Sequence, residues 1–224
     1  MAPQSLSQSA ILALIFGPQA MSFDLGSFNT LRSRLVKNSR GQWALNALAT
    51  LPNEWNAVSN SVTILKQHDG GKLLQDLNEW LKTGQVPPST APFPNVLLAP
   101  LVVTDHVISY LDFLQAAFPD LGDDQELPAA AKKSLETLGL SLGTLSAFAV
   151  SSSSTLSDVE KYGAVAIRLA MLVGAVGDAE DLSRNPEERA LSFSVFWKST
   201  ELHNLMLDTL KAIPEVSQTL SRSI

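Results

Sequence analysis

Two glycines flank a serine near the middle of the chain, in the pentapeptide Gly139-Leu140-Ser141-Leu142-Gly143. In a nucleophile elbow, a strand turns sharply into a helix, and glycines on both sides of the exposed hydroxyl avoid a steric clash in the tight turn. The helix that follows directs its free N–H groups and its positive dipole end towards the place where an oxyanion would form. The spacing therefore predicts that Ser141 handles acyl groups as a nucleophile.

The residues on either side of the pentapeptide supply the setting that an elbow requires. Residues 134–140 are mostly apolar and short, as a buried strand is, and residues 144–150 are small and compatible with a helix. A plain Gly-Ser turn between a strand and a helix would leave the same pattern, and the pentapeptide alone does not separate the two interpretations. In either interpretation, the segment is predicted to run from strand to turn to helix.

Composition excludes several other chemistries. The chain has 224 residues, of which 45% are hydrophobic, enough for one large domain or two small ones with a sizeable core. A net charge of -6 and the lack of any basic cluster argue against nucleic acid as a partner. Without cysteine there is no disulfide and no thiolate, and the three scattered histidines form no metal motif. We expect a cytoplasmic protein with no metal and no bound cofactor.

The apolar run at residues 11–16 lies close to the N-terminus. The first ten residues carry no Lys or Arg, unlike a signal peptide, and the run ends at Gly17-Pro18-Gln19. We interpret it as a buried first strand that ends in a turn. No stretch of the sequence is expected to be long enough to span a membrane.

Apolar residues at helical spacing predict the elements of the first half of the chain. Residues 28–35 are predicted as a helix, and a second apolar stripe begins at Trp43 and is expected to end at Pro52. Residues 72–82 form the clearest amphipathic helix, with Gly84 at the position of a C-terminal glycine. These stripes are interpreted as core packing, which needs no ligand to explain it.

The second half is predicted to contain two further long helices. Residues 96–113 are interpreted as a short strand or extended entry followed by a buried helix, and residues 159–176 as a helix rich in small residues. Residues 178–189 are charged and predicted to loop over the surface. Residues 191–197 alternate at first like a half-buried strand, and Ser199 is expected to cap a final helix.

Five stretches carry a pattern that is far more specific than the pentapeptide. They are FGPQ at 16–19, KLLQDLNEWL at 72–81, PNVLLAPLVV at 94–103, TLGLSLG at 137–143 and YGAVAIRLA at 162–170. Their order and spacing resemble the starter-unit acyl-carrier-protein transacylase domain at the N-terminus of fungal non-reducing polyketide synthases. The resemblance extends over nearly the whole chain, from about Ile11 to Pro214.

The resemblance implies a fold of the α/β class. This fold is that of malonyl-transacylases: an α/β-hydrolase-type core with a short parallel sheet and many helices, and a small ferredoxin-like subdomain. Residues 1–190 are accordingly expected to form the acyltransferase core. Residues 191–224 are expected to be the start of the small subdomain, which is incomplete in this sequence.

The resemblance also implies roles for individual residues. Ser141 stands where the family has its nucleophile. Gln19 matches a residue whose backbone N–H helps to form the oxyanion hole in related transacylases, and the Leu142 N–H would be the second donor. Arg168 resembles an arginine that pairs with a substrate carboxylate in malonyl-selective relatives. The alternatives are a structural arginine bound to backbone carbonyls and, for Gln19, a polar residue at a helix start.

Two departures from the family pattern concern catalysis. The family usually has cysteine where this chain has Ser141, and a hydroxyl, unlike a partly ionised thiol, needs a base within hydrogen-bond reach. The family's catalytic histidine lies beyond the small subdomain, and no match to it is expected before Ile224. The base stays unassigned: His106 is a candidate, but a buried or semi-buried histidine bound to backbone is the favoured interpretation. His68 is expected in a turn and His203 on the surface of the last helix.

Three functions are compatible with these residues. The first is a transacylase of polyketide biosynthesis that moves a starter acyl group from acyl-CoA or a fatty acid synthase carrier, through Ser141, to the phosphopantetheine arm of an acyl carrier protein. The second is a catalytically impaired relative that serves as an accessory or carrier-protein-binding partner. The third, an unrelated serine esterase, ranks last because the sequence has no H-G-G-G motif and only His203 follows the serine. The apolar strand at 191–197 further predicts a homodimer or docking on a larger synthase.

Overall fold

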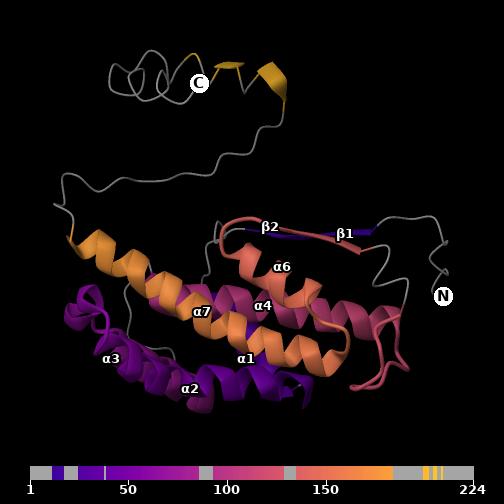
Figure 1. Cartoon of the computed structure of the whole chain (residues 1–224), viewed down its shortest axis with the longest axis horizontal. Helices are drawn as coiled ribbons and strands as arrows, with labels where there is room; N and C mark the ends of the chain where they lie inside the picture. Colours follow the sequence, from indigo (N-terminus) through magenta and orange to yellow (C-terminus); the bar gives the residue numbers. More distant parts are fainter. Residues whose placement is uncertain are drawn as a thin grey trace. The chain divides into compact units, whose positions relative to one another are not determined.

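Two short parallel strands lie against a layer of helices in the described part of the chain (Figure 1). The structure, a computed structural model, describes residues 12–17, 25–37, 39–85, 93–128, 135–183, 199–201, 204–205 and 208. Strand β1 (Leu12–Phe16) pairs in parallel with β2 (Leu135–Gly139), and Phe16 lies opposite Gly139 in the register. Both predicted strands are confirmed as strands, but they are not fully buried as expected, since Ile15 is 65% and Leu138 55% exposed. A mostly helical fold with a short parallel sheet is consistent with the α/β class. The acyltransferase-type core remains a prediction.

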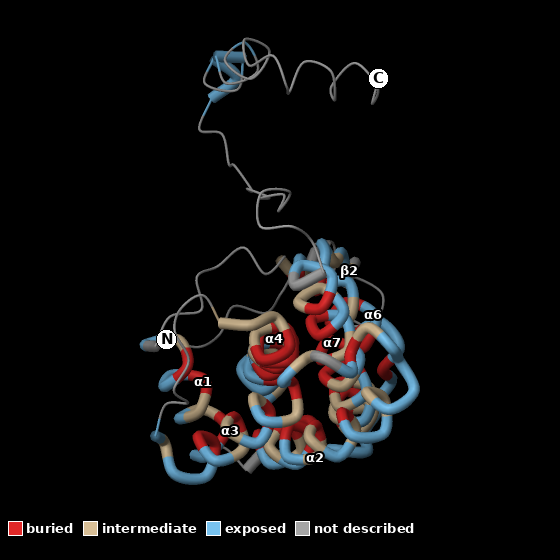
Figure 2. Tube along the Cα trace, turned by 90° about the vertical axis from the view of Figure 1, so that its left-hand side faces the viewer, coloured by how far each residue is buried: buried red, intermediate tan, exposed pale blue. Residues whose placement is uncertain are grey.

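The first helices bury the apolar stripes that the sequence predicts. These helices are α1 (Leu25–Lys37), α2 (Gln42–Ser59) and α3 (Gly70–Thr83). Two short 3₁₀ turns, η1 (Ser39–Gly41) and η2 (Thr63–Gln67), precede α2 and α3 respectively. Figure 2 shows the buried residues of these helices on the faces turned towards the interior.

The predicted end of α3 is confirmed. Gly84 follows the helix with a φ of 80°, in the left-handed region, and its N–H donates to the Trp80 carbonyl at 2.8 Å. Arg32 of α1 reaches the same helix end, where its Nε donates to the carbonyls of Trp80 and Leu81 at 3.1 and 3.0 Å. A cation at the carboxyl end of a helix satisfies free carbonyls and favours the helix dipole.

Helices α4 (Asn95–Ala117) and α7 (Leu156–Ser183) pack side by side at the centre of the molecule (Figures 1 and 2). Helix α6 (Gly143–Ser151) contacts both strands as well as α7. The sheet therefore packs against α6, and α6 packs against α4 and α7. This arrangement places the turn between β2 and α6 at the end of the molecule where α4 begins.

Helix α4 corrects the prediction for residues 96–113, because the whole segment is helical from Asn95, without a strand or an extended entry. Its first turn is closed by Asp178 of α7. This carboxylate accepts the backbone N–H groups of Asn95 and Val96 at 2.9 and 2.8 Å, and the Asn95 side-chain amide at 2.9 Å. A carboxylate in this position satisfies free N–H groups and meets the positive end of the dipole.

Helix α2 does not end at Pro52, as the sequence predicts, but continues to Ser59. A proline inside a helix removes one N–H donor and crowds the carbonyl four residues before it. Neighbouring carbonyls find side-chain donors: the Thr50 hydroxyl donates to the Ala47 carbonyl at 2.8 Å, and the Asn78 amide donates to the Ala49 carbonyl at 3.1 Å. Helix packing and these bonds keep the helix continuous.

Helix α7 confirms the long helix predicted for residues 159–176 and extends it at both ends. Residues 178–183 are therefore helical rather than part of a surface loop, which corrects that prediction. Ala179 is buried at 3% exposure, and Asp178 caps α4. Asp178 and Ala179 thus face the packed interior, whereas Glu180 and Asp181 are exposed.

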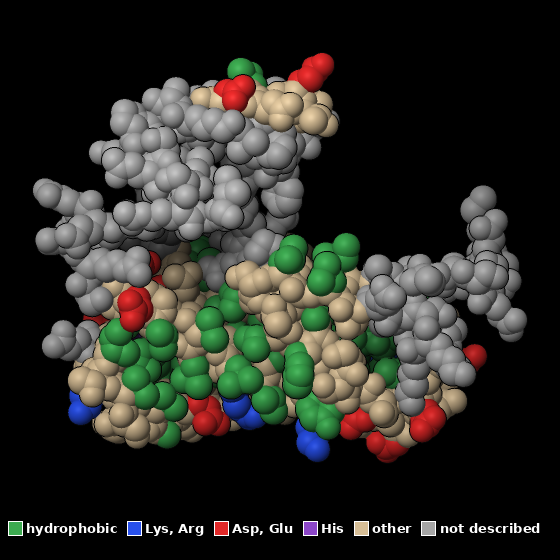
Figure 3. All heavy atoms as spheres, turned by 45° about the horizontal axis from the view of Figure 1, so that its top comes forward, with side chains coloured by type: hydrophobic (Ala, Val, Ile, Leu, Met, Phe, Trp, Pro, Cys, Tyr) green, Lys and Arg blue, Asp and Glu red, His purple; other side chains and the backbone are tan. Residues whose placement is uncertain are grey.

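Two helices are long and apolar enough to span a membrane by length and composition, which corrects the expectation that no stretch would be. Of the apolar window in each helix, 67% is buried in α4 and 44% in α7. We interpret α4 as a core helix, since such helices pass the same test. Helix α7 leaves one face exposed, where hydrophobic side chains gather (Figure 3): Val165, Leu169, Val173 and Val176. The cellular location remains a prediction.

The chain divides into two compact units, Met1–Arg189 and Ala190–Ile224. Within the second unit, residues 200–201, 204–205 and 208 are helical, in agreement with a helix after Ser199. The strand predicted at residues 191–197 lies outside the described residues. The ferredoxin-like nature of this unit remains a prediction.

Candidate functional site

Ser141 has the backbone conformation of an elbow. Its φ is 55°, and among the described residues it is the only non-glycine residue with a positive φ. The left-handed region is unfavourable for a residue with a Cβ, by about 1–2 kcal/mol, and such residues persist only where the surroundings impose the conformation. The predicted order of strand, turn and helix is confirmed here, since β2 ends at Gly139 and α6 begins at Gly143.

Gly139 and Gly143 permit this turn because neither position has room for a side chain. A Cβ at Gly139 would overlap the backbone of Gly143 and Thr144. A Cβ at Gly143 would overlap the carbonyl group of Phe16, at the end of β1. The glycine spacing in the sequence is therefore a steric requirement of the turn.

Backbone hydrogen bonds hold the turn closed and leave one donor next to the serine. The Leu140 N–H donates to the Phe16 carbonyl, the Gly143 N–H to the Leu140 carbonyl and the Thr144 N–H to the Ser141 carbonyl, each at 3.0 Å. No described group accepts the N–H of Leu142. This N–H follows the serine at the positive end of α6, where an oxyanion-hole donor is needed.

Ser141 lines a pocket of about 450 Å³ between the elbow, α4 and α7. This volume lies within the range of small-molecule sites, about 300–1,000 Å³. Among the described residues, no charged side chain lines the pocket, and most of the lining residues are apolar or glycine. The lining residues are Asn95, Ala99, Ser141, Leu142, Thr144, Leu145, Val173, Gly174 and Gly177.

The structure brings Ser141 and Leu142 together but places Arg168 elsewhere. The Arg168 Nε lies 3.4 Å from the Glu54 carboxylate and 3.4 Å from the Thr50 hydroxyl, both on α2. Arg168 therefore does not line the pocket at Ser141. Gln19 lies outside the described residues, so its place in the oxyanion hole remains a prediction.

His106 forms a hydrogen bond with a serine, but the partner is Ser146 and not Ser141. Its Nδ1 lies 3.1 Å from the Ser146 hydroxyl, which is fully buried in α6, and its ring centre lies 5.7 Å from that of Phe16. Burial lowers the pKa of His106 below its ordinary value, and the nearby Asp105 carboxylate opposes this shift. A neutral ring therefore connects α4 to α6 directly behind the elbow.

His68 is the notable residue that sequence reasoning missed. It lies directly after η2 in an extended backbone conformation rather than in the predicted turn, its side chain is only 5% exposed, and its Nε2 lies 3.6 Å from Asp178 Oδ2. Its ring also lies 5.5 Å from the ring of Trp55. Asp178 in turn binds Asn95, which lines the pocket. No local pattern could reveal this pair because its members come from distant segments. His203 lies outside the described residues.

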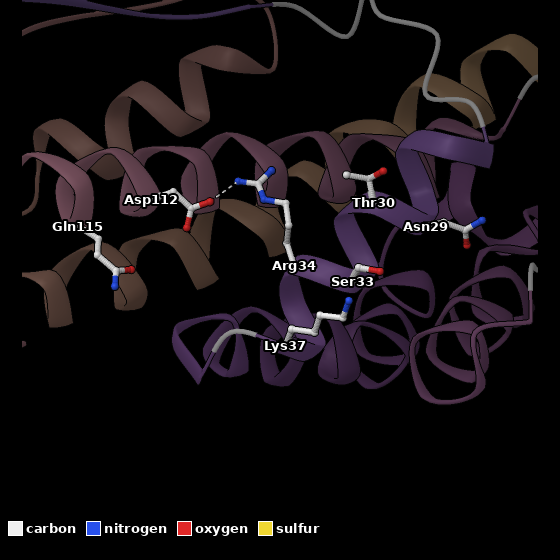
Figure 4. A pocket seen from close by; sticks show the side chains of 7 residues that line it. All are labelled: Asn29, Thr30, Ser33, Arg34, Lys37, Asp112 and Gln115. Carbon is white, nitrogen blue, oxygen red and sulfur yellow. Dashed lines mark hydrogen bonds and ion pairs between the residues drawn. The ribbon is translucent and has the colours of Figure 1, made fainter. Parts of the chain in front are cut away.

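A second, larger hollow of about 750 Å³ lies between α1 and α4 (Figure 4). Its main charged group, Arg34, is occupied by the carboxylates of Asp105 and Asp112, at 2.6 and 2.8 Å (the Asp112 pair is drawn in Figure 4). One arginine and two carboxylates, all partly exposed, form a surface ion-pair cluster, and such pairs contribute little to stability. Within the described ranges, no group of three or more His, Asp or Glu side chains is placed to hold a metal ion.

Comparisons with known proteins place the chain in a family. The family model described as "Starter unit:ACP transacylase in aflatoxin biosynthesis" matches residues 71–216. The chain is 73% identical over 209 residues, 93% of its length, to non-reducing polyketide synthase AC of Didymella fabae. It is 48% identical over 203 residues, 91% of its length, to citrinin polyketide synthase of Monascus ruber. It is 44% identical over 201 residues, 90% of its length, to clavatol synthase claF of Penicillium crustosum.

These matches confirm the resemblance drawn from the five stretches of sequence. The chain belongs to the starter unit:ACP transacylase family, and these relatives are fungal polyketide synthases. It spans 8% of the length of each of the three relatives. The serine elbow and its pocket lie within the segment that matches the family.

Proposed function

We propose that this chain transfers a starter acyl group, by way of Ser141, from an acyl thioester to an acyl carrier protein in polyketide biosynthesis. The observation that carries the proposal is the left-handed backbone of Ser141 between two glycines that cannot bear a Cβ. Such strain at an exposed hydroxyl, beside a pocket and a free N–H, is typical of an acyl-transfer nucleophile. Family membership supplies the class of donor and acceptor.

The proposed reaction has two steps. The Ser141 Oγ attacks the thioester carbonyl, the C–S bond breaks, and the leaving thiolate takes up the proton that the hydroxyl gives up. The phosphopantetheine thiol of the carrier protein then attacks the ester carbonyl, the C–O bond breaks, and the proton of that thiol passes to the Ser141 oxygen. The Leu142 N–H, together with that of Gln19, would stabilise the oxyanion in both steps.

The proposal assigns no described residue as the general base. A serine hydroxyl needs one within hydrogen-bond reach, and His106 is bound to Ser146. Arg168 has no part in the proposal, because its guanidinium lies against α2. A base from outside the described residues, or from a partner, completes the site in this scheme.

Acyl loading tests the proposal. The full chain is incubated with acetyl-, hexanoyl- and octanoyl-CoA, and its intact mass is measured before and after addition of a holo acyl carrier protein. We expect a single acyl adduct that is absent in Ser141→Ala and that moves to the carrier. No adduct from any donor, in a sample shown to be folded, would contradict the proposal.

The second candidate function is an accessory protein that binds the carrier without turnover. The observation in its favour is that the Ser141 hydroxyl has no hydrogen bond to any described side chain. Calorimetric titration with the holo carrier protein separates the two functions. Binding of the carrier by a folded chain that forms no acyl adduct would support the accessory role.

A further inference from the structure

The pocket at Ser141 is suited to an uncharged acyl group. Among the described residues, no charged side chain lines it, and Arg168, the cation that the family resemblance associates with a substrate carboxylate, is paired with Glu54 on α2. Burial of a carboxylate without a partner is unfavourable, whereas burial of a hydrocarbon chain is favourable. An alkyl chain therefore fits these walls better than a dicarboxylate does.

Two glycines of α7 line this pocket, and they differ in what surrounds them. A Cβ at Gly174 would overlap the carbonyl of Asn95, so glycine is required there for α4 and α7 to pack closely. A Cβ at Gly177 would meet no atom of the described chain within 4 Å. Glycine inside a helix destabilises it relative to alanine. Packing thus explains Gly174 but gives no reason for Gly177.

Gly177 lines the pocket, and the space that its Cβ would enter is open. Gly177 lies one helical turn beyond Val173, on the same wall of α7, and Ser141 lies on the elbow that forms another wall. An acyl chain esterified to Ser141 has this space for its far end. A side chain at position 177 would occupy the same volume without disturbing the contact between the two helices.

We propose that Gly177 determines the length of the uncharged acyl chain that the Ser141 pocket accepts. This inference rests on the proposed function only for the identity of the ligand as an acyl group. It predicts that a larger residue at position 177 excludes long chains and still admits short ones. A difference of one methylene in an apolar pocket changes selectivity by about 10–200-fold, so the effect is measurable.

A binding experiment tests the inference without need of turnover. Octanoyl-pantetheine and acetyl-pantetheine are titrated into the full chain in a Ser141→Ala background, which prevents transfer, and binding is measured by calorimetry. We expect Gly177→Leu to weaken the binding of octanoyl-pantetheine by at least about tenfold and the binding of acetyl-pantetheine by less than about threefold. Gly177→Ala should weaken the binding of the longer ligand by an intermediate amount.

Val176→Leu is the matched control, since it adds bulk at the adjacent position of α7, where the side chain is 41% exposed and does not line the pocket. We expect it to change the binding of neither ligand by more than about threefold. Thermal unfolding confirms that each variant is folded, and Gly177→Ala serves in place of the leucine variant if the latter does not fold.

The outcomes separate this inference from the proposed function. The inference would be overturned if the position-177 variants weakened the binding of both ligands equally. It would also be overturned if the Ser141→Ala protein with Gly177 unchanged showed no measurable binding of octanoyl-pantetheine. If Ser141 is never acylated but Gly177→Leu selectively weakens the longer ligand, the proposed function fails and the inference stands. If Ser141 is acylated with unchanged chain-length preference in Gly177→Leu, the inference fails and the proposed function stands.

Discussion

Ser141 and Ser146 belong to the same turn and helix but have opposite environments. Ser141 is exposed, has a φ of 55° and lines a pocket, and its hydroxyl has no hydrogen bond to a described side chain. Ser146 is fully buried, and its hydroxyl lies 3.1 Å from Nδ1 of His106. Among the described residues, the serine that contacts a histidine is thus closed to solvent, and the serine that lines the pocket has no histidine partner.

The difference shows that a serine–histidine contact does not by itself identify a nucleophile. At Ser146 the contact joins two helices, whereas at Ser141 the backbone strain and the neighbouring pocket indicate chemistry. His106 also contacts Phe16, whose carbonyl accepts a hydrogen bond from the turn. The buried pair therefore supports the elbow from behind.

Separate replacement of Ser141 and of Ser146 by alanine should give the largest difference in the rate of acyl loading. We expect Ser141→Ala to lower the rate of acyl loading by about 10³-fold or more, since nucleophile removal in a comparable enzyme costs more than this. Ser146→Ala should stay within about tenfold of the wild type, because its hydroxyl is remote from the reacting atoms. Intact-mass kinetics with hexanoyl-CoA measure both rates. Similar losses in the two variants would remove the distinction drawn here.

The glycines of the elbow should be the next most sensitive positions. Gly143→Ala places a Cβ on the Phe16 carbonyl and should lower the free energy of unfolding by about 3 kcal/mol. Gly17→Ala, at the same end of the sheet, meets no atom within 4 Å and should change it by less than about 1 kcal/mol. Urea denaturation measures both. Equal losses would mean that the turn can relax around a side chain.

Removal of the Ser146 hydroxyl should affect stability more than activity. Ser146→Ala leaves Nδ1 of His106 without its partner, and an unsatisfied buried polar group costs about 1–3 kcal/mol. Ser152→Ala is the control, since Ser152 is exposed in the turn after α6. The two variants are compared by urea denaturation. If Ser146→Ala lowered the free energy of unfolding no more than Ser152→Ala does, the contact between His106 and Ser146 would contribute nothing to stability.

The pH dependence of stability should report on His106. Burial lowers its pKa from the ordinary 6.5 in the folded protein, against the opposing effect of Asp105. Between the two pKa values the unfolded chain therefore binds more protons, so this contribution to stability is complete above 6.5 and is lost as pH falls through the folded-state pKa. The free energy of unfolding of the wild type should accordingly decline relative to that of His106→Gln as the pH is lowered. Parallel curves for the two proteins would contradict this assignment.

Substitution of Arg168 should have the smallest effect on stability and on acyl loading. Its pair with Glu54 is partly exposed, and such pairs contribute about 0–1 kcal/mol, so Arg168→Met should lose no more stability than this. Its rate of acyl loading should stay within about threefold of the wild type, and Glu54→Gln serves as the matched change on the other side of the pair. A drop in loading for Arg168→Met alone would instead support the substrate-binding role that the family resemblance implies.

The elbow could be predicted from the sequence because its requirements are local. Gly139 and Gly143 meet backbone atoms of the turn itself and of the adjoining strand, and the residues that flank them have the composition of a strand and a helix. The amphipathic helix that ends at Gly84 was equally accessible, since both its stripe and its left-handed terminator are local features. Tertiary contacts agree with local preference in both places.

The remaining differences between the predictions from the sequence and the structure arise from contacts between distant segments. The helical start of α4 depends on Asp178, and the continuation of α2 through Pro52 is assisted by the Asn78 side chain. His68 was predicted in a turn, but it is extended between η2 and α3, and its burial against Asp178 was not predictable from its neighbours. The partner of His106 likewise required the structure, because α6 brings Ser146 and not Ser141 to the ring.

The cap on α4 has a consequence for the order in which this site becomes complete. Among the described residues, Asp178 accepts hydrogen bonds from the N–H groups of Asn95 and Val96, and it emerges from the ribosome well after them. This wall of the pocket at Ser141 is therefore completed only when α7 docks during synthesis. In the mature protein, hydrogen exchange at these two amides should require detachment of α7, so their exchange rates measure how often the pocket opens.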